Sequence, residues 1–196
     1  SVGIPQFMLT STLPVRFALD FLGPEEFREG DVFVANDPYH GGGHLPDYNV
    51  FAPVYATDES GTRRMVLICS IQCHHGDTGG GVPGGYNVTA DDVWAEGVRW
   101  PVVKVVDRGE ERRDILYALQ VNNRLPGFLG DIRAQIGAAQ LGARRLQEIV
   151  EFANHHRVDL IVMSSHRIDP NHLAETWGTL SYKVSVVCEC PILLVK

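Results

Sequence analysis

The pattern of apolar and polar positions predicts a β-sheet in the first half of the chain. Residues 31–35, DVFVA, are a short apolar run that stops at the turn tripeptide NDP of residues 36–38, so we expect a buried strand there. Two further β-rich runs, residues 48–57 and 64–73, are separated by the polar turn DESG of residues 58–61. This arrangement predicts an antiparallel hairpin with a long connection.

Helical spacing dominates the next part of the chain. Apolar and polar residues alternate at helical spacing over residues 91–99, and again over 112–125 and from 131 to about 155, while residues 102–106 are typical of a strand. Residues 7–20, by contrast, mix apolar and small polar side chains without a clean period. The helix beginning at 131 has the clearest apolar face, made by Ile132, Ile136, Ala139, Leu146, Ile149 and Val150.

The pattern changes after that helix. Residues 158–163 and 191–195 are continuous apolar runs, typical of strands buried on both faces, and residues 171–187 between them are helical. We therefore predict a mixed α/β protein in two pieces: an α+β front over residues 1–150, and a partial Rossmann-like βαβ unit over residues 151–196. The boundary falls inside a predicted helix.

Two glycine-rich loops leave the ends of predicted strands. Residues 36–47, NDPYHGGGHLPD, and residues 74–85, HHGDTGGGVPGG, contain too much glycine and proline for a regular helix or a central strand. Loops of this kind commonly carry functional side chains on a rigid scaffold. Half of the chain's eight histidines lie in them. The ionisable side chains of interest are Asp37, His40, His44, Asp47, His74, His75 and Asp77.

Imidazole and carboxylate groups together suit Mn, Fe or Zn, and glycine lets a short segment fold tightly enough for such groups to converge. A solvated or hydrogen-bonded loop residue is the alternative for any single histidine, and an Asx-type turn cap ahead of Pro38 is the alternative for Asp37. His74 and His75 point to opposite faces if that segment is extended, so one can bind metal while the other meets substrate. The clustering favours a metal site.

Composition narrows the classes of function. The chain has 196 residues, 44% of them hydrophobic, and its 17 basic and 24 acidic side chains give a net charge of −7 with no basic block, which argues against binding to nucleic acid. Because no apolar run approaches the roughly 20 residues that cross a bilayer, we expect a cytoplasmic protein without a membrane partner. The four cysteines are interpreted as buried, reduced thiols, with a zinc site as the alternative. The opening residues SVGIP resemble the middle of a domain, so we expect a fragment or a processed product.

Two long motifs carry a resemblance to a known family. GDVFVANDPYHGGGHLPDYNVFAPVY at residues 30–55 and CHHGDTGGGVPGGYNVTADDVWAEGVRWP at residues 73–101 resemble the hydantoinase B/oxoprolinase family, and within it the alpha subunits of acetone carboxylases. The resemblance runs from the first residue to about residue 151. It is carried by paired motifs and is therefore specific, although alpha subunits of this kind are several times longer.

The resemblance implies a cytoplasmic, ATP-dependent, multi-subunit enzyme that carboxylates acetone with bicarbonate to acetoacetate. It also implies a manganese site in this subunit and two partners: a hydantoinase A-like subunit that handles ATP, and a small third subunit. Carried onto this sequence, it makes Asp37, His44, Asp47 and one of the pair His74–His75 the metal candidates. The residues leave open which of that pair binds metal, and a hydantoinase or 5-oxoprolinase specificity stays open as well. We assign metal binding to Asp37, His44, Asp47 and His75, and catalytic roles to His40, His74 and Asp77.

The tail, from about residue 152, resembles the C-terminal end of universal stress proteins, which have a small nucleotide-binding-like α/β sheet. ATP-binding members of that family carry a glycine pattern, and here Ser164 and Arg167 occupy the first two glycine positions, so ATP binding by the tail is not expected. In that family the terminal strand tends to pair between subunits, so the resemblance implies a homodimer through residues 191–195. A binding or dimerisation module of this kind is thus the alternative function from a different class.

Overall fold

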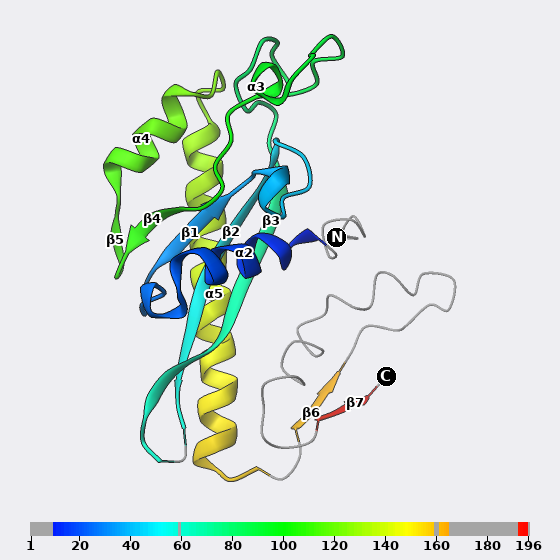
Figure 1. Ribbon diagram of the computed structural model, residues 1–196. Coiled ribbons are helices and arrows are strands. Elements are labelled where there is room, and N and C mark those ends of the chain that lie inside the picture. Colours follow the sequence, from blue (N-terminus) through cyan, green and yellow to red (C-terminus); the bar gives the residue numbers. More distant parts are fainter. Residues whose placement is uncertain (1–9, 59, 159–160, 165–191, 196) are drawn as a thin grey trace.

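The structure is a computed structural model that describes residues 10–58, 60–158, 161–164 and 192–195 (Figure 1). Its main element is a five-stranded sheet with the strand order β3-β2-β1-β4-β5, in which every neighbouring pair is antiparallel. The strands are β1 (Val32–Ala35), β2 (Asp47–Thr57), β3 (Arg63–His74), β4 (Val103–Asp107) and β5 (Glu110–Glu111).

The long hairpin of β2 and β3 confirms the predicted pair of strands and sets the register of the site. Asp47, the first residue of β2, lies opposite His74, the last residue of β3, and Asn49 lies opposite Gln72. Since paired residues share a face of the sheet and alternate residues return to it, these four side chains lie on one face, at the end where β2 begins.

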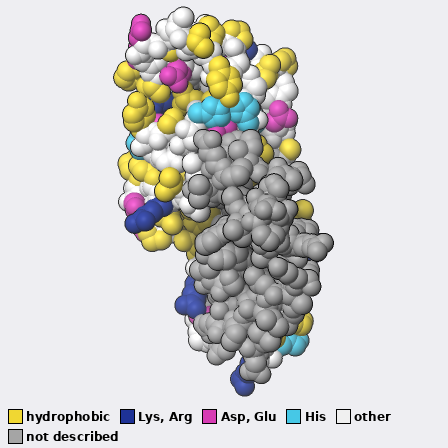
Figure 2. Space-filling model, turned by 90° about the vertical axis from the view of Figure 1, so that its right-hand side faces the viewer, with side chains coloured by type: hydrophobic (Ala, Val, Ile, Leu, Met, Phe, Trp, Pro, Cys, Tyr) yellow, Lys and Arg dark blue, Asp and Glu magenta, His cyan; other side chains and the backbone are white. Residues whose placement is uncertain are grey.

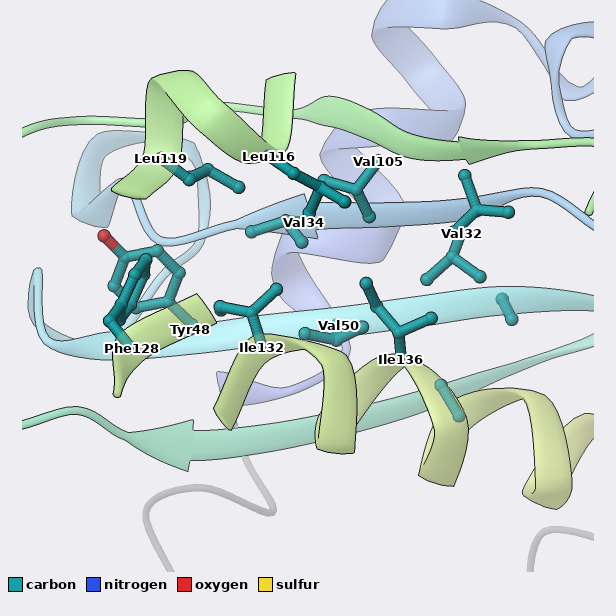
Figure 3. Close-up of a cluster of buried hydrophobic side chains, with 13 residues drawn as sticks. Val32, Val34, Tyr48, Val50, Val105, Leu116, Leu119, Phe128, Ile132 and Ile136 are labelled. Carbon is teal, nitrogen blue, oxygen red and sulfur yellow. The ribbon is translucent and has the colours of Figure 1, made fainter. Parts of the chain in front are cut away.

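Helices cover both faces of this sheet. The helix α5 (Phe128–His155) and the helix α4 (Arg113–Val121) pack on one face, as Figure 3 shows, where Ile132 and Leu116 meet strand residues such as Val34. On the opposite face, α2 (Leu13–Leu22) covers a second cluster that contains the stacked rings of Phe33 and Phe51. The central strand β1 and most of β2 are therefore buried on both faces.

The predicted helix from 131 to about 155 is confirmed in α5, and five of its six predicted face residues are buried. Residues 7–20 lacked a period, yet α2 forms there. It begins at Leu13, has Pro14 in its first turn and buries only Pro14 and Ala18, while Leu13 and Phe21 stay exposed. A helix with so narrow a buried stripe gives a weak periodic signal.

Two other helices are shorter than predicted. The helix α3 (Val93–Glu96) is a single turn ended by Gly97, and α4 stops at Val121 although helical spacing continues to residue 125. The side-chain amide of Asn123 donates to the backbone carbonyl of Asp77, 2.6 Å away, and Arg124 is drawn to the Asp77 carboxylate. These tertiary contacts end α4 early. Two 3₁₀ turns, η1 (Pro24–Glu26) and η2 (Pro38–His40), complete the front of the chain.

Beyond α5, the described residues of the tail include β6 (Ile161–Ser164) and β7 (Ile192–Val195), which pair in parallel, while the βαβ unit as a whole stays a prediction. The predicted helix over 171–187 lies outside the described residues, as does Arg167. The helix α5 is continuous across residue 150, so the boundary predicted there stays a prediction, as does a homodimer through the terminal strand. Among the described helices, none combines the length and apolar character needed to cross a membrane.

The packing of α5 leads to a test with an internal control. Ile132 is fully buried between α5 and the sheet, whereas Leu141 on the same helix is about half exposed, at 49%. Ile132→Ala should lower the free energy of unfolding by about 3 kcal/mol, because it removes buried methyl groups and leaves a cavity. Leu141→Ala should change it by about 0.5 kcal/mol or less. Urea denaturation measures both, and equal losses would contradict this packing.

Candidate metal centre

Three side chains from both predicted loops meet where β2 begins and β3 ends. The Nδ1 atom of His44 lies 2.5 Å from Oδ2 of Asp47, and Nδ1 of His74 lies 3.1 Å from Oδ1 of the same carboxylate. The two imidazole rings stack with their centroids 5.0 Å apart. One ligand atom from each of the three residues can be chosen so that all lie within 4.8 Å of one another.

One side of the cluster is buried in the protein, and the other side is open to solvent. The Asp47 carboxylate is completely buried, whereas the side chains of His44 and His74 are 38% and 39% exposed. Figure 2 shows histidine side chains gathered at the surface on one face of the protein. A small ion or substrate can therefore reach the imidazoles from solvent, while the sheet holds the carboxylate from beneath.

Asp47 differs from the other buried aspartates in the described residues. Asp31 lies 2.7 Å from the Lys104 ammonium group, Asp37 lies 2.8 Å from the Arg99 guanidinium group, and Asp77 lies 2.7 Å from the Arg124 guanidinium group. Among the described residues, the ion-pair partners of the Asp47 carboxylate are only the imidazoles of His44 and His74. Because a buried carboxylate requires positive charge or several donors, Asp47 is the aspartate whose surroundings best suit a bound cation.

Asp37 was predicted to bind metal, and the structure gives its oxygens other partners. One oxygen accepts the backbone N–H of Tyr39, which caps η2 as an Asx turn does, and the other accepts hydrogen bonds from Arg99 and from His40 at 2.8 Å. Burial raises the pKa of Asp37, but the hydrogen bonds from Arg99 and His40 outweigh burial and hold its pKa below the ordinary value. Asp37 and His40 thus brace the first loop beside the cluster.

Asp77, predicted to be catalytic, is the corresponding brace of the second loop. Its carboxylate accepts hydrogen bonds from the backbone N–H groups of Gly79, Gly84 and Arg124, and from the Arg124 side chain. Burial raises its pKa, but these donors outweigh burial and lower the pKa overall. The Arg124 guanidinium group also reaches the carbonyl oxygens of the glycine run, so one ion pair fixes the whole turn.

His75, predicted as the ligand of the histidine pair, faces away from the cluster. Its buried ring packs edge-on against Tyr48 and Phe128 and lies 3.3 Å from the side-chain oxygen of Gln135. Burial lowers the pKa of His75 below its usual value, which favours the neutral ring. The predicted opposition of His74 and His75 is thus found in the structure, and His74 is the one that joins His44 and Asp47.

Three sets of residues near the cluster or its supporting aspartates were not predicted from the sequence. The Tyr86 hydroxyl lies 2.9 Å from Nε2 of His44. If the neutral His44 ring donates to Asp47 through Nδ1, its Nε2 atom accepts a hydrogen bond from this hydroxyl. Arg99 and Arg124 have no motif that marks them as partners of Asp37 and Asp77. Asn49 and Gln72 did leave a signal: polar residues at every second position in otherwise apolar strands point to one face, beside Asp47 and His74.

Gly43 allows the first loop to approach the cluster closely. A Cβ atom added there would lie 2.9 Å from Oδ2 of Asp47, which is closer than side-chain carbons approach buried oxygens. The glycine run between His40 and His44 therefore lets the loop pass directly over the carboxylate, as its composition suggested.

In this chain, a glycine-rich loop before β2 and a second one after its hairpin partner β3 thus meet at one carboxylate. The sequence matches the hydantoinase B/oxoprolinase family over residues 1–166. The chain therefore belongs to the hydantoinase B/oxoprolinase family, as its two long motifs indicated.

Known relatives agree with this assignment. The caprolactamase beta subunit of Pseudomonas jessenii is 37% identical over 145 residues, which are 73% of this chain and 24% of that subunit. A protein described as one subunit of a D-/L-hydantoinase, from Pseudomonas sp. strain NS671, is 38% identical over 129 residues, 65% of this chain and 21% of that protein. The chain thus spans about a fifth to a quarter of these relatives.

Two solved structures share the fold. The crystal structure of the ATP-dependent caprolactamase from P. jessenii superposes with a TM-score of 0.70 and 34% identity, over 79% of this chain and 26% of that one. A nucleotide-free acetone carboxylase superposes with a TM-score of 0.66 over 80% of this chain and 20% of that one, and its 21% identity supports the fold alone. The resemblance of the tail to universal stress proteins stays a prediction.

The brace at Asp77 leads to a second test. Replacing Arg124 with Met leaves the buried Asp77 carboxylate without its cation and should lower the free energy of unfolding by about 2 to 3 kcal/mol, since the arginine is itself partly exposed. Arg112→Met, which removes an exposed ion pair with Asp114, is the matched control and should have little effect. Urea unfolding of both variants measures the difference, and a harmless Arg124→Met would refute the brace.

Proposed function

We propose that this chain holds the metal-binding core of a hydantoinase B-type protein, with a divalent cation bound by His44, Asp47 and His74. The observation that carries the proposal is the Asp47 carboxylate, which is fully buried and has two imidazoles but no Lys or Arg partner in the described residues. His74 takes the ligand role that the sequence analysis gave to His75, because His75 is turned into the core beside Tyr48. Asp37 supports the loop and is not a ligand in this proposal.

The donor set fits the metals expected from the sequence. Two imidazoles and one carboxylate are a common set for Mn, Fe and Zn and leave further positions for water or substrate. When bound, such a cation polarises a carbonyl oxygen as a Lewis acid. The residues of this chain then hold the cation against the strand ends, keep one side open to solvent and supply the Tyr86 hydroxyl at the rim.

Metal content tests the site directly. The purified chain, loaded with Mn²⁺ or Zn²⁺ and dialysed, should retain about one equivalent, and the double variant His44→Ala with Asp47→Ala should lower the affinity on the order of 100-fold or more because two ligands are lost. His156→Ala is the control: its exposed ring stacks on Phe152 just beyond the end of α5, outside the cluster, so metal binding should persist. Elemental analysis and isothermal titration give both quantities, and retention of metal by the double variant would refute the site.

For the reaction, we propose ATP-dependent opening of a cyclic amide by the assembled enzyme. The support is the 34–37% identity to the caprolactamase, which is described as ATP-dependent, and the similarity to a hydantoinase subunit. In the assembled enzyme, a partner resembling hydantoinase A would handle ATP, and a small third subunit would complete the complex. This chain would present the substrate carbonyl to the cation. Carboxylation of acetone with bicarbonate is the second candidate, favoured by the resemblance of the two long motifs to acetone carboxylase alpha subunits.

A chimera tests whether the segment from this chain supports the cyclic-amide reaction. Residues 10–158 of this chain replace the matching segment of the P. jessenii caprolactamase beta subunit, and the hybrid is assembled with its natural partner. ATP hydrolysis should be stimulated by caprolactam or another cyclic amide, and the Asp47→Asn hybrid should lose most of that stimulation. Stimulation by acetone with bicarbonate, and by no cyclic amide, would support the second candidate instead.

A further inference from the structure

Two side-chain nitrogens beside the cluster lack a hydrogen-bond acceptor in the part of the chain that the structure describes. Within the described residues, three buried side-chain nitrogens have no hydrogen-bond acceptor: those of Asn49, Gln72 and Gln135. Asn49 and Gln72 face each other across β2 and β3, two residues along the strands from the pair Asp47–His74. Buried donors without acceptors are rare in folded proteins because they lose their hydrogen bonds to water, so each calls for an explanation.

The side-chain oxygen of Gln72 has a hydrogen-bond partner among the described residues, unlike its nitrogen. That oxygen accepts a hydrogen bond from the Thr10 hydroxyl at 3.1 Å, which leaves the nitrogen on the other side of the amide. The nitrogen faces Gly43: it lies 3.4 Å from the point where a Cβ on Gly43 would stand, and Oδ2 of Asp47 lies 2.9 Å from the same point. A free donor and a ligand oxygen thus approach one glycine from the same side.

Asp47 has room for another donor. Each of its oxygens accepts one imidazole, and an ionised carboxylate can accept about four hydrogen bonds. The carboxylate therefore has lone pairs left for a donor that approaches from the side of Gly43.

We propose that Gln72 is a positioning residue for the metal centre: its side-chain amide donates to Oδ2 of Asp47 when the cation is bound, and thereby holds the carboxylate in its ligating orientation. This inference rests on the metal site proposed above and adds a residue to it. Hydrogen bonds to ligating carboxylates from residues outside the ligand set orient the ligands, and losing one typically costs about 10- to 100-fold in metal affinity. Gly43 keeps the space between the two groups open, since any larger residue would separate them.

Metal titration of the full chain tests this role. Gln72→Met keeps the length of the side chain and removes the donor, and it should weaken Mn²⁺ binding by about 10-fold or more. It should also alter the visible absorption spectrum of the Co²⁺-loaded chain, which depends on ligand geometry. Gln147→Met is the matched control, because Gln147 donates to Glu151 far along α5, and it should leave both the affinity and the spectrum unchanged.

A second measurement needs no substitution. In the ¹⁵N-labelled chain, the side-chain amide protons of Gln72 should shift downfield and exchange more slowly with solvent on titration with Zn²⁺, because they gain an acceptor. Unchanged Gln72 amide protons in a chain that does bind Zn²⁺, or an unchanged affinity and spectrum in Gln72→Met, would overturn the role of Gln72 alone. Failure of the unaltered chain to bind any of these metals would overturn the metal site and this inference together.

Discussion

The stability of this fold depends on how it compensates aspartate carboxylates that are buried away from water. Four aspartates are buried in the described residues, and each must be offset by positive charge or by several hydrogen-bond donors. Three of them have a lysine or arginine, and these ion pairs hold β1 and the two glycine-rich loops in place. The fourth, Asp47, is offered imidazoles at the open end of the central hairpin. This difference in partners separates the three aspartates that hold the fold together from the one that is a candidate metal ligand.

The same arrangement explains how a cluster built from loops is held in place. The register of β2 and β3 sets Asp47 against His74, and helices on both faces of the sheet prevent this register from slipping. The ion pair of Asp37 with Arg99 fixes the loop that carries His44, and the ion pair of Asp77 with Arg124 fixes the loop that follows His74. Flexible glycine segments thereby present imidazoles in a defined position.

Much of this could be predicted from the sequence, because the signals were local. The strands of the hairpin, the long helix α5 and both glycine-rich loops follow from periodicity and turn chemistry. The roles of the aspartates could not be separated, because Arg99 and Arg124 are distant in sequence from Asp37 and Asp77 and only the fold brings them together. Choosing between His74 and His75 likewise required the strand register, since neighbouring residues on a strand differ only in the face they occupy.

X-ray absorption spectroscopy of the Zn²⁺-loaded chain tests the central claim most directly, because it reports the ligands of the ion without any substitution. Coordination by His44, Asp47 and His74 predicts multiple scattering from two imidazoles, nitrogen and oxygen neighbours at about 2.0–2.2 Å, and no sulfur. A sulfur shell at about 2.3 Å, which would implicate cysteines such as Cys69 or Cys73, or a spectrum without imidazole, would contradict the assignment of the metal to the buried Asp47 carboxylate.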